Sequence, residues 1–275
     1  MNNFFIIINS EKKLAEKTGQ AIMEHLDSFQ GKARYSFWDR GRRERYELPE
    51  GCDCIITIGG DGTLIQAARA TVGSGVPIIG INRGHMGYLT QLSDEKSIIP
   101  SIDRLLRDDC FIEERMMLRA VARRDGEVFY EEVALNEVML ARYNTTRSLR
   151  FDVYVNDTML NEYFADGILA ATPTGSTAYS LSAGGPIADP KARLIILTPI
   201  CSHAMNSRSI IFSADDRIKI VAGSQGQIAA CDGESMLKLR EGDEIEISRS
   251  DHVARFIRLK QESFLETLRQ KMTYV

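Results

Sequence analysis

The sequence predicts an α/β domain, then a mostly antiparallel β domain and a closing helix, and three observations lead to that prediction. Apolar, β-branched runs alternate with helical periodicity over residues 1–110, as in domains built on a parallel sheet. Short β-like runs separated by turn dipeptides follow over residues 111–260. An amphipathic stretch over residues 261–275 ends the chain, and we expect it to pack back on the first domain.

The first domain is expected to be a Rossmann-like α/β domain. Strands are predicted over residues 4–8, 34–37, 54–58 and 77–81, and helices over residues 14–29, 64–70 and 98–106. The order strand, helix, strand, strand, helix, strand requires crossover connections and therefore a parallel sheet. Ligands of such sheets bind beyond the carboxyl ends of the strands, where the glycine-rich loops of this chain are expected.

The composition is that of an ordinary globular protein. Of the 275 residues, 44% are hydrophobic and 26% are charged, and the net charge is −4, which gives no support to nucleic-acid binding. The five cysteines form no CxxC pair, which favours reduced thiols in a cytosol. No apolar run approaches the roughly 20 residues of a membrane span. We therefore expect a cytoplasmic protein that has neither nucleic acid nor membrane as a partner.

A glycine-rich turn is the first candidate site. Gly59, Gly60 and Gly62 follow an apolar run and surround a single carboxylate, Asp61, before Thr63 and a helix-permissive segment. Glycines let another molecule approach the backbone closely, and the N-terminus of a helix favours anions such as phosphate. Because Asp61 is itself an anion, it either caps the helix, faces a hydroxyl, or shares a cation with a phosphate.

Two segments of the second domain also concentrate polar groups. Asn136 and Glu137 stand between apolar residues, and such a pair can bind nucleoside hydroxyls and ring nitrogens, although a polar pair on an edge strand would look the same. Residues 166–186 combine a strand, a hydroxyl-rich loop, a short helix over residues 176–183 and a Gly-Gly-Pro sequence. The start of that helix suits a polar ligand, and a simple capped helix is the alternative.

In this order and spacing, these motifs resemble the NAD kinase family. The matching segments are GGDGT at residues 59–63, Asn-Glu at 136–137, TPTGSTAYS at 172–180, LSAGGPI at 181–187 and TPIC at 198–201. The resemblance covers roughly residues 4–260. GGDGT is shared with lipid kinases, whereas the segment at residues 172–180 is much more specific. The chain departs from the family pattern at Ser202, where proline is usual, and at Glu234, where glutamine is usual.

The resemblance implies transfer of the γ-phosphoryl group of ATP to the 2′-hydroxyl of the adenosine ribose of NAD, which gives NADP. It places Asp61 against the reacting ribose, as a general base or as an orienting group, with the glycines and Thr63 on the phosphate side. It also implies a homodimer or homotetramer. The positions that it assigns to the nucleoside and nicotinamide pockets are Tyr88, Asn136, Glu137, Asp166, Thr174, Thr177, Ala178, Tyr179 and Ser182.

The cation that accompanies the phosphates is not evident in the motifs. The chain has neither GxxxxGK[ST] nor GxGxxG, so a Walker lysine is missing. We therefore expect Mg²⁺ or another divalent cation, bound with ATP, to bridge Asp61 and the triphosphate, and no metal site of the protein's own. His85, in a glycine-rich loop, is a further candidate for ligand contact. Two alternatives stay open: an NAD-binding sensor without transfer activity, and a GGDGT-type lipid kinase.

Overall fold

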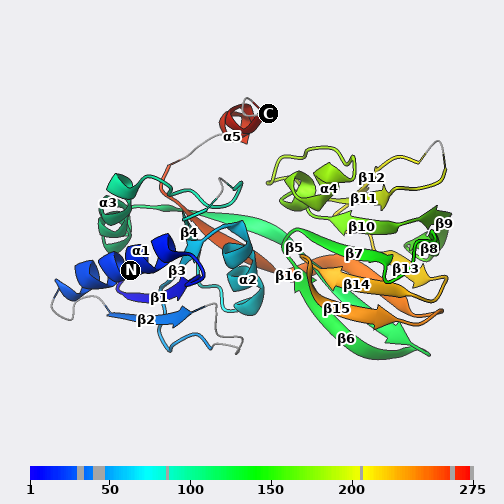
Figure 1. Cartoon of the computed structure of the whole chain (residues 1–275), viewed down its shortest axis with the longest axis horizontal. Coiled ribbons are helices and arrows are strands. Elements are labelled where there is room, and N and C mark those ends of the chain that lie inside the picture. The colour runs from blue at the N-terminus through cyan, green and yellow to red at the C-terminus, as the bar shows by residue number, and fades with distance from the viewer. Residues whose placement is uncertain (30–33, 40–46, 85–86, 205–206, 261–263, 273–275) are drawn as a thin grey trace. The chain divides into compact units, whose positions relative to one another are not determined.

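The chain forms two compact units in the computed structural model, which describes residues 1–29, 34–39, 47–84, 87–204, 207–260 and 264–272. The α/β unit comprises Met1–Glu114 and Ala254–Val275, and the β unit comprises Arg115–Val253 (Figure 1). The sequence predicts these limits after residues 110 and 260. The expected packing of the last helix on the first domain stays a prediction.

The α/β unit is built on four parallel strands in the order β2-β1-β3-β4. The strands are β1 (Asn3–Ile8), β2 (Arg34–Asp39), β3 (Cys54–Gly59) and β4 (Ile78–Asn82), and the helices are α1 (Lys13–Asp27), α2 (Asp61–Ala70), α3 (Glu95–Leu106) and α5 (Phe264–Met272). In register, Ile8 lies opposite Ile58, and Gly59 lies opposite Asn82. The carboxyl ends of β1, β3 and β4 therefore meet at one edge of the sheet.

Apolar side chains on both faces explain why these strands lie inside the unit. Phe4, Ile6, Ile56 and Ile58 are fully buried, and α1 covers the sheet with an apolar side that includes Ile22. Full burial of a side chain of this size stabilises a fold by about 1.5–3 kcal/mol. The expected parallel α/β arrangement is confirmed.

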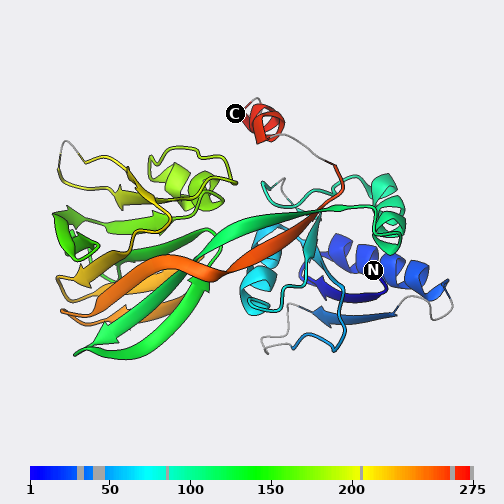
Figure 2. The ribbon, with the colours of Figure 1, turned by 180° about the vertical axis from the view of Figure 1, so that it is seen from behind.

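The β unit contains two mostly antiparallel sheets (Figure 2). In one, the order is β16-β13-β8-β9, with β5 beside β16 and β6 beside β5; in the other, it is β12-β11-β10-β7-β14-β15. The strands are β5 (Phe111–Arg124), β6 (Glu127–Ala134), β7 (Glu137–Arg142), β8 (Leu149–Val155), β9 (Thr158–Ala165), β10 (Gly167–Ala171), β11 (Leu194–Ile200), β12 (Ile210–Ser213), β13 (Ile218–Ala222), β14 (Gln227–Cys231), β15 (Glu234–Leu239) and β16 (Glu244–Arg258). One core joins both sheets, with Phe151 and Ile220 from the first and Val138 and Ile168 from the second.

Several elements of the β unit differ from the sequence expectation. The sequence predicts no strand over β9 or β15, which lie at the edges of the two sheets and whose mixed polar sequences carry no strong strand pattern. It predicts separate strands over residues 244–247 and 256–259, but both runs belong to one long strand, β16. The helix expected at residues 176–183 is a 3₁₀ turn, η1 (Gly175–Thr177), followed by one short helix, α4 (Tyr179–Ser182).

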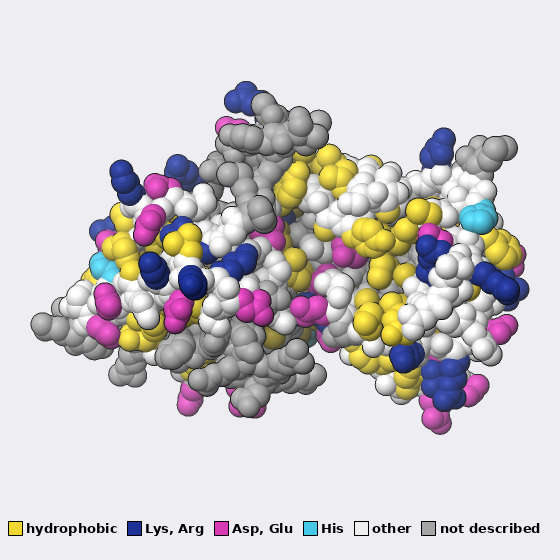
Figure 3. All heavy atoms as spheres, in the orientation of Figure 1, with side chains coloured by type: hydrophobic (Ala, Val, Ile, Leu, Met, Phe, Trp, Pro, Cys, Tyr) yellow, Lys and Arg dark blue, Asp and Glu magenta, His cyan; other side chains and the backbone are white. Residues whose placement is uncertain are grey.

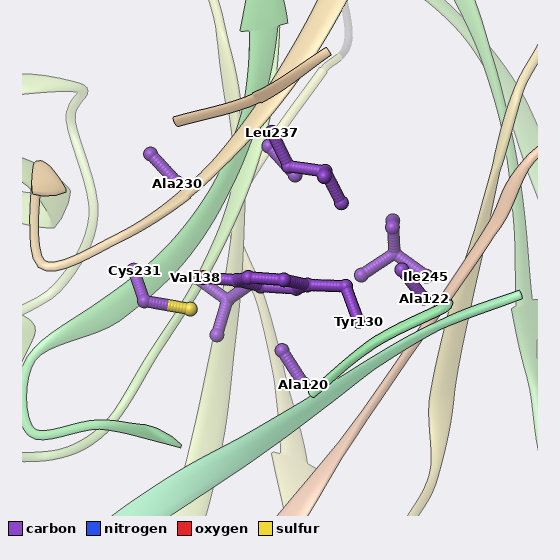
Figure 4. Close-up of a pocket in the computed structure, with 9 residues that line it drawn as sticks. Ala120, Ala122, Tyr130, Val138, Ala230, Cys231, Leu237 and Ile245 are labelled. Carbon is purple, nitrogen blue, oxygen red and sulfur yellow. The ribbon is translucent and has the colours of Figure 1, made fainter. Parts of the chain in front are cut away.

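A small apolar cavity lies in the core of the β unit. Its volume is about 10 Å³, and Figure 4 shows the ring of Tyr130 lying across it. The lining residues are Ala120, Ala122, Tyr130, Val138, Ala229, Ala230, Cys231, Leu237 and Ile245. A cavity of this size barely holds one water molecule, so it is a packing gap and not a ligand site.

Candidate functional site

The glycine-rich turn connects β3 to α2 at the carboxyl edge of the parallel sheet. Gly60 is the N-cap of α2, in an extended conformation and without a side-chain cap hydrogen bond, and Asp61 is the first helical residue. A side chain at Gly59 would collide with Thr63 Oγ1, so the turn closes only around glycine. The helix-cap interpretation of Asp61 is therefore wrong, and its carboxylate is available for another contact.

That contact is with the segment that follows β4. Asp61 Oδ2 accepts hydrogen bonds from the backbone N–H groups of Tyr88 (2.6 Å) and Leu89 (3.1 Å). Asp61 Oδ1 accepts from the backbone N–H of Thr90 (3.1 Å) and from its hydroxyl (2.9 Å). A side chain at Gly87 would collide with the carboxylate. Four donors use the acceptor positions that a carboxylate offers, so a ligand hydroxyl that reaches Asp61 must replace one of them.

The residues around this turn include one expected neighbour and one that sequence reasoning missed. Tyr88 is half-buried and contacts Asp61 through its backbone. Thr90 supplies two of the four donors, and no local pattern in the sequence links it to a carboxylate 29 residues earlier. His85 lies outside the described residues.

In the β unit, Glu137 is a buried carboxyl group at the start of β7. Its side chain is 7% exposed, Oε2 has no hydrogen-bond partner among the described residues, and the Tyr179 N–H donates to the carboxylate. Burial, together with the negative charge of Asp232, raises the pKa of Glu137 to about 8, against the effect of the Tyr179 hydrogen bond. At neutral pH the group is therefore mostly protonated and can donate as well as accept. Because β7 lies between β10 and β14, the edge-strand interpretation of residues 136–137 is wrong.

Asp232 fixes the backbone that carries this pair. Its carboxylate accepts from the N–H groups of Leu135 (2.8 Å), Asn136 (2.7 Å) and Glu137 (3.1 Å). Sequence reasoning assigned Asp232 no role. The available signal was the Asp232-Gly233 dipeptide, which takes positive φ at both residues in the turn between β14 and β15.

The hydroxyl-rich loop packs directly against residues 135–137. Thr172 Oγ1 donates to the Leu135 carbonyl (2.6 Å) and accepts from the Gly175 N–H (3.0 Å). A side chain at Gly175 would collide with the Asn136 backbone. Thr174 Oγ1 accepts from Arg115 Nη1 at 3.3 Å. The structure thus brings the second and third predicted motifs together, although some of the loop's hydroxyls serve internal hydrogen bonds.

The remaining predicted site residues of the β unit are less buried than Glu137 and Thr174. Thr177 and Ala178 are half-buried, and Tyr179 and Ser182 are exposed on α4. Asp166 forms an ion pair with Arg142, with 3.0 Å between Asp166 Oδ2 and Arg142 Nη2. Arg142 was not anticipated, and its charge offsets that of Asp166 before any ligand is considered.

A divalent cation that bridges Asp61 to a nucleotide would have to replace protein donors on the carboxylate, as a ligand hydroxyl would. The described residues contain no group of three or more His, Cys, Asp or Glu side chains able to hold a metal ion. The acceptor positions of Asp61 are already used by four protein donors. A divalent cation would therefore have to arrive with the phosphates of a nucleotide.

Within the described part of the chain, no helix has the length and apolar character to span a membrane.

Comparisons with known proteins relate both units to NAD kinases. The family models described as the ATP-NAD kinase N-terminal and C-terminal domains match residues 2–110 and 135–259. The NAD kinase of Lachnospira eligens is 46% identical over 240 residues, 82% of each chain. That of Symbiobacterium thermophilum is 39% identical over 282 residues, 99% of each chain.

Two solved structures have the same fold at 23% identity. Yeast NADH kinase complexed with NADH has a TM-score of 0.86, and the match covers 100% of this chain and 88% of that chain. An NAD kinase from Archaeoglobus fulgidus in complex with ATP has a TM-score of 0.80 and full coverage of both chains. The predicted fold class is therefore confirmed.

Proposed function

This chain belongs to the ATP-NAD kinase family, and from that premise we propose that Asp61 holds the 2′-hydroxyl of the adenosine ribose of NAD while MgATP donates its γ-phosphoryl group. The activity is therefore that of an NAD kinase, which phosphorylates NAD to NADP. Neither the sensor nor the lipid-kinase alternative is favoured, because the curated relatives are named NAD kinases over nearly the whole chain.

The observation that carries the role of Asp61 is its set of four hydrogen bonds to residues 88–90. These bonds fix the carboxylate between the glycine-rich turn and the next loop. A ribose hydroxyl that replaces one of the donors would be held in a defined direction. Phosphoryl transfer depends mainly on positioning and charge stabilisation, so this geometry supports an orienting role for Asp61 more than proton removal.

The other predicted residues divide between the two units. We propose that Gly59, Gly60, Gly62 and Thr63 shape the phosphate side, and that Asn136, Glu137, Thr174 and Tyr179 bind a nucleoside. The buried, unpartnered Glu137 Oε2 supports the second proposal. The roles of Tyr88, Asp166, Thr177, Ala178 and Ser182 rest on the family resemblance alone.

The substitution Asp61→Asn tests the central assignment. We expect the turnover number for NADP formation to fall at least about 100-fold, because the amide nitrogen faces donors instead of accepting from them. The measurement is NADP formation from NAD and MgATP, together with the melting temperature of the variant. Asp53→Asn is a matched control, since Asp53 also accepts backbone N–H bonds, from Asn2 and Asn3, before the start of β3. Turnover of Asp61→Asn within a few-fold of wild type would contradict the assignment.

A substrate panel separates the three candidate activities. The purified protein is offered NAD, NADH and diacylglycerol with MgATP, with and without EDTA. Formation of NADP or NADPH that depends on the divalent cation supports the proposal. Bound NAD without phosphorylated product would favour the sensor, and phosphatidic acid as the product would favour the lipid kinase.

We also propose a cytoplasmic homodimer or homotetramer. Large apolar side chains remain exposed on the β unit, namely those of Met159, Phe164, Ile211 and Met236. Figure 3 shows hydrophobic side chains gathered on the face of this unit that is turned to the viewer. Exposed apolar patches are a common mark of protein interfaces. Light scattering coupled to size-exclusion chromatography measures the oligomeric mass directly.

A further inference from the structure

Lys12 brings a cation to the glycine-rich turn from a distant part of the sequence. It follows β1 and is the N-cap residue of α1, and its backbone N–H donates to the Asn9 carbonyl at 3.1 Å. The Asn9 N–H in turn donates to the Ile58 carbonyl at 3.0 Å. These bonds fix the loop after β1 beside the end of β3, where the glycine-rich turn starts.

The ammonium group of Lys12 lies between two glycines of neighbouring loops. A Cβ atom at Gly60 would be 3.6 Å from Lys12 Nζ, and one at Gly84 would collide with it. Neither glycine has a positive φ, and a Cβ at Gly60 would only be in ordinary contact with Lys12 Nζ. At Gly84, an added Cβ would have to displace the end of the lysine side chain. The two loops thus leave room for a cation beside the N-terminus of α2.

No carboxylate of the described residues forms an ion pair with Lys12, although its side chain is only half-exposed. The nearby carboxylate of Asp61 is engaged by residues 88–90. Arg83, a second basic side chain among the described residues of this region, is buried and donates to Thr18 Oγ1 at 2.7 Å and to the Ser93 carbonyl at 3.0 Å.

We propose that Lys12 is a phosphate-binding residue of this enzyme, whose ammonium group holds an oxyanion of the ATP polyphosphate at the glycine-rich turn. The N-terminus of α2, which starts within the glycine-rich turn, favours negative charge and adds to the same field. Lys12 thereby supplies the charge that a Walker lysine supplies in P-loop enzymes, from a different loop. The proposal rests on the proposed kinase function and names the protein's own contact to the donor.

The test compares Lys12→Gln with Lys12→Arg, and with Lys13→Gln, which changes the exposed neighbour. MgATP is titrated calorimetrically without NAD, and kcat and the two KM values are then measured for NADP formation. We expect Lys12→Gln to weaken MgATP binding and to lower kcat/KM for ATP about 10- to 100-fold, the loss typical of a hydrogen bond to a charged group. The affinity for NAD should stay within about twofold, Lys12→Arg should recover most of the loss, and Lys13→Gln should match wild type.

Gly84→Ala reaches the same contact without removing the lysine. Its methyl group would displace the flexible end of Lys12 at little cost to folding, so MgATP binding should weaken severalfold. This variant keeps the test decisive if Lys12→Gln does not fold. The double variant Lys12→Gln/Gly84→Ala should bind MgATP no more weakly than Lys12→Gln alone, because both changes remove one contact.

Three results would overturn the proposal: unchanged MgATP affinity in Lys12→Gln, equal losses in Lys12→Gln and Lys12→Arg, or the same loss in Lys13→Gln. Failure of the kinase function is a separate result. If wild-type protein forms no NADP but binds MgATP through Lys12, the kinase activity fails and the role of Lys12 stands.

Discussion

At the residue scale, burial changes what a carboxyl group can offer a ligand. Glu137 and Asp232 lie close enough that the charge of Asp232 contributes to raising the pKa of Glu137. Asp232 is the ionised partner, because it accepts three backbone hydrogen bonds. Glu137, with one free oxygen, is left as the proton carrier. The pair therefore combines one anion that fixes the backbone with one neutral acid, which we propose binds a nucleoside.

The free energy of unfolding of the protein should depend on pH because of Glu137. Its pKa is about 8 in the folded chain and 4.5 in the reference state, so between these values only the folded state holds the proton. The free energy of unfolding should therefore fall as pH rises from about 4.5 to about 8. Glu137→Gln stays neutral at every pH and lacks this contribution. Thermal unfolding from pH 5 to 9 should show the variant gaining stability relative to wild type as pH rises.

The control for this experiment is Glu127→Gln, which changes an exposed carboxylate on β6. Its difference from wild type should vary little over the same range. If the difference between wild type and Glu137→Gln is equally flat, Glu137 is ionised in the folded protein and its proposed donor role is wrong.

At the element scale, the sequence predicts those helices and strands whose burial shows in their own local pattern of apolar residues. Strands β1, β3 and β4 are apolar on both faces, and their continuous apolar sequences predict that they are buried. Edge strand β9 is mostly exposed, so its alternation is weak. The contacts that hold the candidate site are non-local: Asp61 meets residues 88–90, and Asp232 meets residues 135–137. Family resemblance could name Asp61 and Glu137, but only the fold reveals the groups that fix them.

The contact of η1 with the start of β7 gives a prediction about two such elements. Gly175→Ala should destabilise the protein by about 1–3 kcal/mol, because the added methyl group meets the Asn136 backbone, which cannot move easily. The affinity for NAD should fall as well, since the displaced backbone carries Asn136 and Glu137, the proposed nucleoside-binding residues. Chemical denaturation and NAD titration measure the two effects. Leu181→Ala, an exposed change on α4, should leave both nearly unchanged, and a Gly175→Ala variant as stable as wild type would show that the two segments separate readily.

At the scale of the whole molecule, the chain returns to its first unit after completing the second. The end of β16 pairs with β4 through Phe256 and Ile78, and Ile257 joins the core that contains Phe4 and Ile56. The Gln91 side chain donates to the Ile257 carbonyl. The last strand therefore completes the core under the glycine-rich turn, although some 200 residues of sequence separate the two.

This return can be tested with one core substitution in each unit. Ile257→Ala should cost about 2–5 kcal/mol and Phe151→Ala about 3–5 kcal/mol, because both side chains are fully buried. Hydrogen exchange read by mass spectrometry should show faster exchange in β1, β3 and β4 for Ile257→Ala, and in β8 and β13 for Phe151→Ala. If Ile257→Ala instead loosened only peptides from residues 115–253, the end of β16 would belong to the β unit. The end of the chain would then not stabilise the parallel strands that carry the glycine-rich turn.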